Sequence, residues 1–298
     1  MAKVGHIRKF SAGWRTSSQG FTRIDLFVLL GIVCIVGLLL MLHHCNSTRP
    51  LKVSARELTV KRQQCLANIK QLVTAQLIYS ADHRGKFCPS YLDYQSTELQ
   101  NVWMGALADY HGRTNGVWLC PSATNPPVHS YKGTADSPWT YTDRVSETST
   151  PGAYALNGYL GLGRNYRQSK AATFKVRNVF GAGPAVQRPA LTPAFCDAIY
   201  WNCRLEETDV PSRNLYQPQG IVLEPDVLKI LTQVVARHGD FAPFAAPRQT
   251  TSNFLPGSIN IAFVDGHADT VPLEDLWKLN WHKNWDLKKV PWPHAAPQ

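Results

Sequence analysis

Residues Leu26 to Leu42 read LFVLLGIVCIVGLLLML, an apolar run of seventeen residues without interruption. As an α-helix this run is roughly 26 Å long at about 1.5 Å per residue, close to the shortest length that crosses a bilayer. A helix buried in a protein core usually keeps a polar stripe, and this run has none. The sequence therefore predicts a transmembrane helix over residues 21–45 in preference to a buried core helix.

Basic residues gather around this apolar run. Residues 1–62 contain ten Lys and Arg against two acidic residues, whereas residues 63–298 contain 21 against 19. The first 24 residues have no acidic residue, so the positive-inside bias places the N-terminus in the cytoplasm and the body outside. The near-neutral body lacks the basic excess of a nucleic-acid-binding domain, and we predict no nucleic-acid partner.

The residues in front of the apolar run indicate how the chain is processed. A polar stretch, Ser17-Ser18-Gln19-Gly20, meets Phe21, and Asp25 follows at the fifth position from Phe21. This junction resembles the cleavage and methylation site of type IV prepilins and type II secretion pseudopilins. The resemblance implies that a prepilin peptidase cuts after Gly20 and that Phe21 is methylated. It also implies that Asp25 pairs with the N-terminal ammonium of a neighbouring pilin-like subunit.

Two positions of the junction depart from the family pattern. The family nearly always has Glu where this chain has Asp25, and the third position, here Arg23, is normally aliphatic. Both charges are also consistent with a helix that simply ends at a membrane interface. The apolar run ends in His43-His44-Cys45 and not in the small residues of a signal-peptide cleavage site, so we expect it to remain in the mature chain.

A second helical pattern follows in residues 46–85. Leu58, Cys65, Leu72 and Tyr79 recur at steps of seven and form one apolar stripe, and Gly85 is a plausible end of the helix. In the pilin-like proteins that this segment resembles, a long N-terminal helix has a membrane half and a half that packs on a sheet. Packing on the chain's own body is expected here in preference to a free coiled coil.

Residues 86–298 predict a β-rich α+β domain, because short apolar strings alternate with turn signals. Alternating residues on both sides of Asp265-Gly266 predict a hairpin over 258–271, and helices are predicted near 225–237 and 273–277. This end resembles a group of pilin-like proteins named for a His that precedes an Asp-Gly pair. His238, Asp265, Gly266 and His267 are therefore assigned to a structural motif, with an unusually long loop after His238.

We expect this motif to have neither a catalytic nor a metal-binding role. An Asp at a hairpin turn serves the backbone, so Asp265 and His267 are interpreted as structural and not as an acid–base or metal pair. Calcium is an alternative, with Asp265, Asp269, Glu274 and Asp275 as donors, but no EF-hand spacing supports it. No catalytic motif appears, and we predict no enzyme activity, no metal and no cofactor.

Seven cysteines remain to be assigned. No C-x-x-C pair occurs, which disfavours a zinc ribbon. In an oxidising compartment Cys88 with Cys120, or Cys196 with Cys203, are possible disulfides, and buried free thiols are the equal alternative.

The sequence thus predicts an α+β pilin-like fold with four regions. These are a basic leader (1–20), a transmembrane helix (21–45), the extramembrane half of the same long helix (46–85) and an antiparallel β-rich domain (86–298). The expected protein is a pseudopilin-like structural subunit of a type II secretion or type IV pilus-like system. Its expected location is the inner membrane, single-pass, with the C-terminal domain in the periplasm or outside the cell.

Two other functions are alternatives at this point. One is a signal-anchored extracytoplasmic domain that binds a glycan, a protein or a metal and does not polymerise. Four tryptophans are available for such a binding surface: Trp103, Trp118, Trp139 and Trp201. The other is a hydrolase, which needs a pocket that gathers His238, His267 and a carboxylate.

Overall fold

The computed structural model describes residues 23–47, 53–90, 102–126, 131–143, 146–161, 176–218, 235–250 and 254–290. The chain divides into two compact units, Met1–Lys52 and Val53–Gln298. The first unit contains one described helix, α1 (Arg23–Ser47). The second unit, called the body below, contains α2 (Ala55–Asp82) and every described strand.

The N-terminal region contains two helices where the sequence predicted one long helix. The second helix begins with its own cap, because Ser54 is extended and its side chain accepts a hydrogen bond from the Glu57 N–H at 3.1 Å. Glu57 also pairs with Lys61 one turn later, at 2.8 Å. These local signals start a new helix at Ala55, so the prediction of one continuous helix is wrong.

The predicted membrane-spanning half of that helix is also contradicted. Among the described residues, no helix is both long enough and apolar enough to cross a bilayer.

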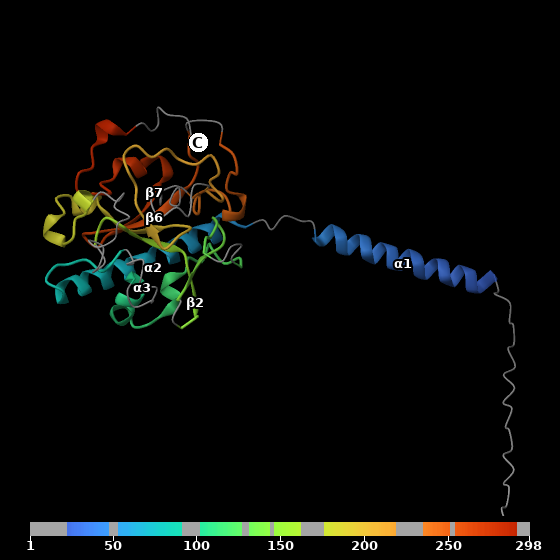
Figure 1. Cartoon of the computed structure of the whole chain (residues 1–298). Coiled ribbons are helices and arrows are strands. Elements are labelled where there is room, and N and C mark those ends of the chain that lie inside the picture. Colours follow the sequence, from blue (N-terminus) through green and yellow to red (C-terminus); the bar gives the residue numbers. More distant parts are fainter. Residues whose placement is uncertain are drawn as a thin grey trace, which may run out of the picture. The chain divides into compact units, whose positions relative to one another are not determined.

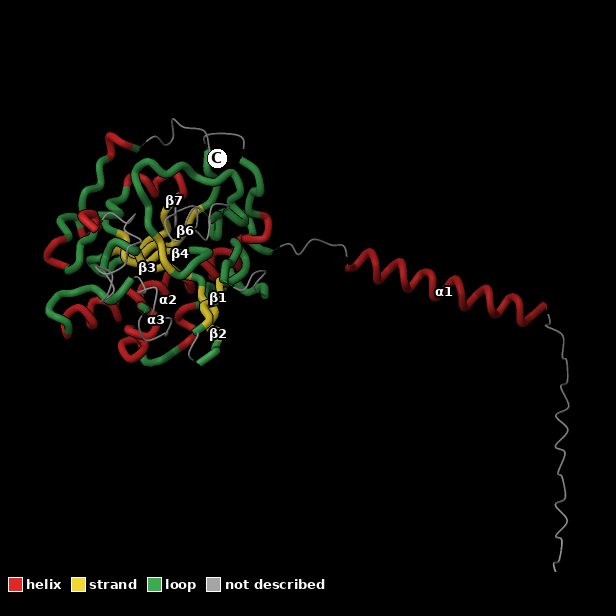
Figure 2. The backbone as a smooth tube through the Cα atoms, viewed as in Figure 1, coloured by secondary structure: helices red, strands yellow, loops and turns green. Residues whose placement is uncertain are grey.

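The body is α+β and rich in strands, as predicted. A five-stranded sheet has the order β5-β3-β4-β6-β7, with β3 (Tyr154–Asn157), β4 (Pro193–Asp197), β5 (Asn202–Cys203), β6 (Ser258–Phe263) and β7 (Ala268–Pro272) (Figure 2). All neighbours are antiparallel except β3 and β5. A separate antiparallel pair is formed by β1 (Trp139–Thr142) and β2 (Ser149–Gly152).

Helix α2 covers one face of the five-stranded sheet (Figure 1). Its buried stripe, which includes Cys65, Ile69 and Leu72, forms one core with Tyr154 of β3 and Phe195 of β4. This stripe is the one that the heptad spacing predicted. The helix ends where the chain turns into the left-handed region at Arg84 and Gly85, and the Gly85 N–H donates to Ser80 O at 2.7 Å.

The opposite face of the sheet carries a second core. Ile259, Ile261 and Phe263 of β6 point into it, and it is covered by Trp277 and Trp281 from the C-terminal segment. Because successive residues of a strand face opposite sides, β6 is buried at every position and contributes to both cores. The sheet is therefore closed on both faces.

Short helices connect these strands. One α-helical turn, α3 (Trp103–Ala106), precedes β1. The 3₁₀ turns are Ala108–His111, Asn115–Trp118, Val176–Asn178, Gly183–Ala185, Pro189–Leu191, Pro243–Ala245, Leu273–Lys278 and Leu287–Lys289. The predicted helix at 273–277 is thus a 3₁₀ helix. The one predicted near 225–237 lies outside the described residues except for its last three, which are not helical.

Candidate functional site

The first candidate surface is helix α1, whose described side chains are exposed all around the helix. All large apolar side chains described between Ile24 and Met41 are between 48% and 73% exposed. A Cβ atom added at Gly31 or Gly37 would meet no other atom within 4 Å, so the backbone is open to close approach there. The thiol of Cys34 is free and exposed on the same helix.

The processing residues predicted from the junction cannot be placed on this surface. Gly20 and Phe21 lie outside the described residues, and so does the leader 1–20. Asp25 belongs to α1, but its side chain is outside the described part of the structure.

The second candidate site lies inside the body, where four side chains with metal-ligating atoms converge. Cys65 comes from α2, Cys120 from the segment after the 3₁₀ turn Asn115–Trp118, Asp197 from the end of β4, and His238 from a bridge to Ser258 at the start of β6. One ligand atom from each lies within 4.8 Å of the others. All four residues are buried.

The contacts within this cluster are short. The His238 Nε2 atom lies 3.4 Å from Cys65 Sγ, 3.7 Å from Cys120 Sγ and 3.1 Å from Asp197 Oδ2. Cys65 Sγ lies 3.4 Å from Asp197 Oδ1. Asn260 borders the cluster through its side-chain amide, with Nδ2 3.3 Å from His238 Nε2.

A buried cation compensates the carboxylate of this cluster. The Arg237 guanidinium is fully buried and lies 3.5 Å from Asp197 Oδ1. It also donates to the backbone carbonyls of Thr134 at 2.9 Å, Ala135 at 3.2 Å and Ala153. Its hydrogen bonds therefore replace the water that it loses, as a buried charge requires.

The local charges shift the acidities of the cluster in opposite directions. Burial raises the pKa of Asp197, but the charges of His238 and Arg237 and the Asn260 N–H, which donates at 2.7 Å, bring it below its ordinary value. Burial lowers the pKa of His238, but the Asp197 carboxylate and Cys120 raise it to about 9.

The pKa values of the two thiols, Cys65 and Cys120, are also shifted in opposite directions. Burial raises the pKa of Cys65 well above its ordinary value, and the hydrogen bond to Cys120 and the charge of Asp197 add to this rise. Burial also opposes ionisation of Cys120, but the hydrogen bond from Cys65 and the charge of His238 lower its pKa to about 6. Cys120 is therefore the thiol that carries negative charge most readily.

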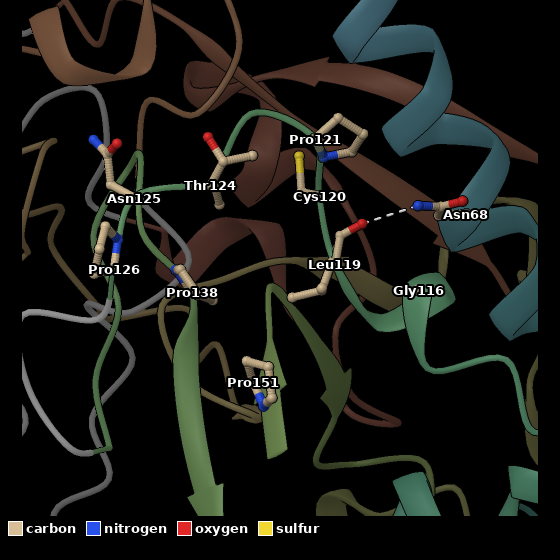
Figure 3. A pocket seen from close by; sticks show the side chains of 11 residues that line it. Asn68, Gly116, Leu119, Cys120, Pro121, Thr124, Asn125, Pro126, Pro138 and Pro151 are labelled. Carbon is tan, nitrogen blue, oxygen red and sulfur yellow. Dashed lines mark hydrogen bonds between the residues drawn. The ribbon is translucent and has the colours of Figure 1, made fainter. Parts of the chain in front are cut away.

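A pocket of about 490 Å³ is lined in part by Cys120, the one member of the cluster that borders it (Figure 3). Cys120 forms part of its wall, together with Asn68 of α2, whose side-chain amide donates to Leu119 O at 2.9 Å. Four prolines are among its other lining residues, including Pro138 just before β1 and Pro151 of β2.

A third group lies near the C-terminal segment. The His282 Nε2 atom is 3.0 Å from a Glu207 oxygen, and the other Glu207 oxygen accepts from the Asp286 N–H at 2.9 Å. Burial raises the pKa of Glu207, but these hydrogen bonds and the charge of His282 lower it overall. The group ties the C-terminal segment to the turn after β5.

The predicted hairpin is present, but its turn is longer than the two residues expected. Strands β6 and β7 are joined by four residues, and the Gly266 N–H donates to Phe263 O at 2.9 Å. Asp265 accepts from the backbone N–H of His267 at 3.1 Å and contacts its Nδ1 at 2.6 Å. The His267 ring stacks on Phe263 with the centroids 4.3 Å apart.

The hydrolase arrangement does not form among these residues. His238 bridges the first residue of β6, whereas His267 follows the last, so the two lie at opposite ends of a six-residue strand of about 17 Å. The four predicted calcium donors form no cluster among the described residues. Asp265 binds His267, Asp269 accepts from the Thr270 N–H, Asp275 pairs with Lys278, and Glu274 accepts from the Leu255 N–H.

The described cysteines are all free thiols, and all except Cys34 are buried. Cys120 belongs to the four-residue cluster, and Cys88 is placed elsewhere in the core beneath α2, with its N–H 3.3 Å from Gln76. Cys196 and Cys203 do approach, with their Sγ atoms 3.6 Å apart. This separation is longer than the roughly 2.05 Å of a disulfide bond, so the two are free thiols in this structure.

The tryptophans that were available for a binding surface are core residues. Trp103 and Trp139 are fully buried, and Trp118 and Trp201 are almost so. Their burial means that these four residues do not supply the aromatic surface that a glycan-binding domain would need from them.

Sequence reasoning missed the buried cluster, although it singled out His238. The four residues are at least 41 positions apart along the chain, so no local sequence motif predicts that they form a cluster. No protein-family model matches this chain, and no curated protein or solved structure matches it either.

Proposed function

We propose that the protein is a pilin-like structural subunit, cut after Gly20 by a prepilin peptidase, that associates with other pilin-like subunits through α1. The body, from Val53 onward, is the part displayed outside the cytoplasm. The observation that carries the proposal is the exposed apolar surface of α1, a helix that belongs to a unit separate from the body.

The size of this surface calls for a partner. Fourteen large apolar side chains are exposed on α1, from Ile24 to Met41. Burying them against other side chains is worth on the order of 20 kcal/mol or more, at about 1.5–3 kcal/mol for each. A helix that is apolar on all sides is a buried helix, so α1 is expected to sit among other apolar helices.

Helices of equivalent subunits are the partner that the chain itself favours. The open backbone at Gly31 and Gly37 permits close helix packing, as small residues do between apolar helices. The junction at Gly20 and Phe21 resembles the pilin-like pathway, in which such helices associate. Asp25 supplies the one carboxylate of the helix at the position where that family pairs it with a neighbour's N-terminus.

Cys34 gives a direct test of this association. In a Cys45→Ser background it is the exposed thiol of α1, whereas the other described thiols are buried in the body. A short bismaleimide added to cells that contain a prepilin peptidase is expected to link Cys34 to Cys34 and give a dimer band. Cys34→Ser in the same background is the matched control and should give none.

The Asp25→Ala variant distinguishes ordered packing of neighbouring α1 helices from unspecific apolar association. Loss of the carboxylate is expected to reduce the Cys34 dimer at least several-fold, because neighbouring helices lose their register. A dimer yield equal to that of the parent, or no dimer in the parent at equal protein level, would contradict the proposal.

A further inference from the structure

We propose that the body binds one Zn²⁺ ion through Cys65 Sγ, Cys120 Sγ, a carboxylate oxygen of Asp197 and His238 Nε2. The ion fixes α2 to the sheet. This inference concerns the body alone and does not depend on the association of α1.

The distances within the cluster are close to those of a tetrahedral site. Ligand atoms that lie about 2.0–2.3 Å from a tetrahedral zinc ion are about 3.3–3.8 Å from one another. His238 Nε2 lies 3.1 Å from Asp197 Oδ2, 3.4 Å from Cys65 Sγ and 3.7 Å from Cys120 Sγ, and Cys65 Sγ lies 3.4 Å from the other carboxylate oxygen, Oδ1. One ligand atom from each of the four residues lies within 4.8 Å of the others. The ion therefore needs only small side-chain movements to enter.

The chemistry of the donors selects the metal. Two thiols and one imidazole are soft or borderline ligands, which suit zinc and exclude calcium and magnesium, whose ligands are oxygens. Four protein ligands fill a tetrahedral shell and leave no position for water or substrate. A site of this kind is structural in zinc proteins, whereas catalytic sites keep an open position.

The charges balance when the ion is present. Two thiolates and the Asp197 carboxylate contribute three negative charges, and Zn²⁺ with the buried Arg237 contributes three positive charges, with His238 neutral. The cluster is buried, where a net charge is costly, so this neutrality favours the bound state.

Neighbouring residues hold the ligands in position. The Tyr154 hydroxyl of β3 donates to Cys65 Sγ at 3.2 Å, and the Asn260 N–H of β6 donates to Asp197 Oδ2 at 2.7 Å. Hydrogen bonds of this kind orient metal ligands and are worth about 10–100-fold in metal affinity. Cys120 also forms part of the pocket wall, so the pocket comes up to one ligand of the site (Figure 3).

The position of the site defines its role. Its ligands come from α2, the segment before β1, the end of β4 and the segment entering β6, so one ion joins parts of the body that are distant in sequence. Helix α2 is the element that follows α1 in the chain. The ion would thus hold α2, the first helix of the body, rigidly against the sheet.

The test measures zinc in the purified full-length chain. Protein made in zinc-supplemented medium and dialysed against metal-free buffer is expected to contain one zinc per chain by plasma mass spectrometry. The Cys65→Ser/Cys120→Ser double variant should contain none above the buffer blank. Cys88→Ser, which removes a buried thiol outside the cluster, should keep the full equivalent.

Two further measurements do not depend on whether the double variant folds. Co²⁺ added to the chelator-treated parent chain should give the intense visible bands of tetrahedral cobalt with thiolate ligands. Tyr154→Phe keeps all four ligands and should bind Co²⁺ about 10–100-fold more weakly.

The inference fails if the folded parent chain carries no zinc and gives no thiolate–cobalt spectrum. It also fails if the freshly isolated chain has a Cys65–Cys120 disulfide, because the ligands are then consumed. Equal cobalt affinity for the parent and Tyr154→Phe would remove Cys65 from the proposed ligand set.

Discussion

Replacing Arg237 by leucine is expected to lower the free energy of unfolding of the body by about 3–5 kcal/mol. The guanidinium is fully buried and offsets the charge of Asp197, and it satisfies the carbonyls of Thr134, Ala135 and Ala153. Leucine fills part of the space but leaves the carboxylate and three buried acceptors without this donor. Urea unfolding followed by tryptophan fluorescence measures the loss.

Arg188→Leu is the matched control for Arg237→Leu. Arg188 is exposed, and it lies outside the buried cluster, so its replacement should change stability by less than about 0.5 kcal/mol. A loss below about 1 kcal/mol for Arg237→Leu would mean that water reaches Asp197 and that the cluster is not a dry site.

Replacing Trp103 by alanine is expected to cost about 3–5 kcal/mol of the same unfolding free energy. The ring is fully buried and meets Phe195 of β4 edge-on, with the centroids 5.3 Å apart. Its Nε1–H donates to Trp201 O at 2.8 Å, so alanine leaves both a cavity and a buried acceptor.

Phe244→Ala provides the comparison for Trp103→Ala, because Phe244 is 41% exposed. Its removal should cost less than about 1 kcal/mol, and both variants are measured by urea unfolding. Equal losses for the two variants would show that Trp103 is not the centre of the core between α2 and the sheet.

Elements built from neighbouring residues were predictable from the sequence. The stripe of α2 repeats within the helix, and Gly85 ends it by a backbone conformation that glycine adopts easily. The hairpin of β6 and β7 likewise rests on alternation around Asp265-Gly266. Each of these signals acts between near neighbours or repeats along one helix.

The start of α2 is marked by a local signal as well. Ser54 and Glu57 form a capping pair that begins a separate helix, whereas the apolar patterns on both sides favoured one continuous helix. The approach of Cys196 and Cys203 depends instead on strand order, because β3 lies between their strands and their Sγ atoms are still 3.6 Å apart.

The buried cluster was not predictable from the sequence, because its residues are distant along the chain. Cys65, Cys120, Asp197 and His238 meet only because α2 packs across β4 and β6. His238 attracted attention as part of a motif with Asp265, yet its ring contacts Asp197 at 3.1 Å, and its backbone bridges Ser258. The long loop after His238 is the consequence of this bridge at the start of β6.

The two proposals assign separate tasks to the two units. Helix α1 provides an apolar surface for association, and the body is a closed α+β domain held together across α2. Failure of the zinc test leaves the association of α1 untouched, and failure of the Cys34 cross-link leaves the zinc site untouched.

The most direct test of the pilin-like assignment is the N-terminus of the mature chain. Intact mass and N-terminal sequencing are measured on full-length protein made with and without a prepilin peptidase. The account predicts a peptidase-dependent chain that begins at a methylated Phe21. A chain that still carries residues 1–20 in both samples would contradict it.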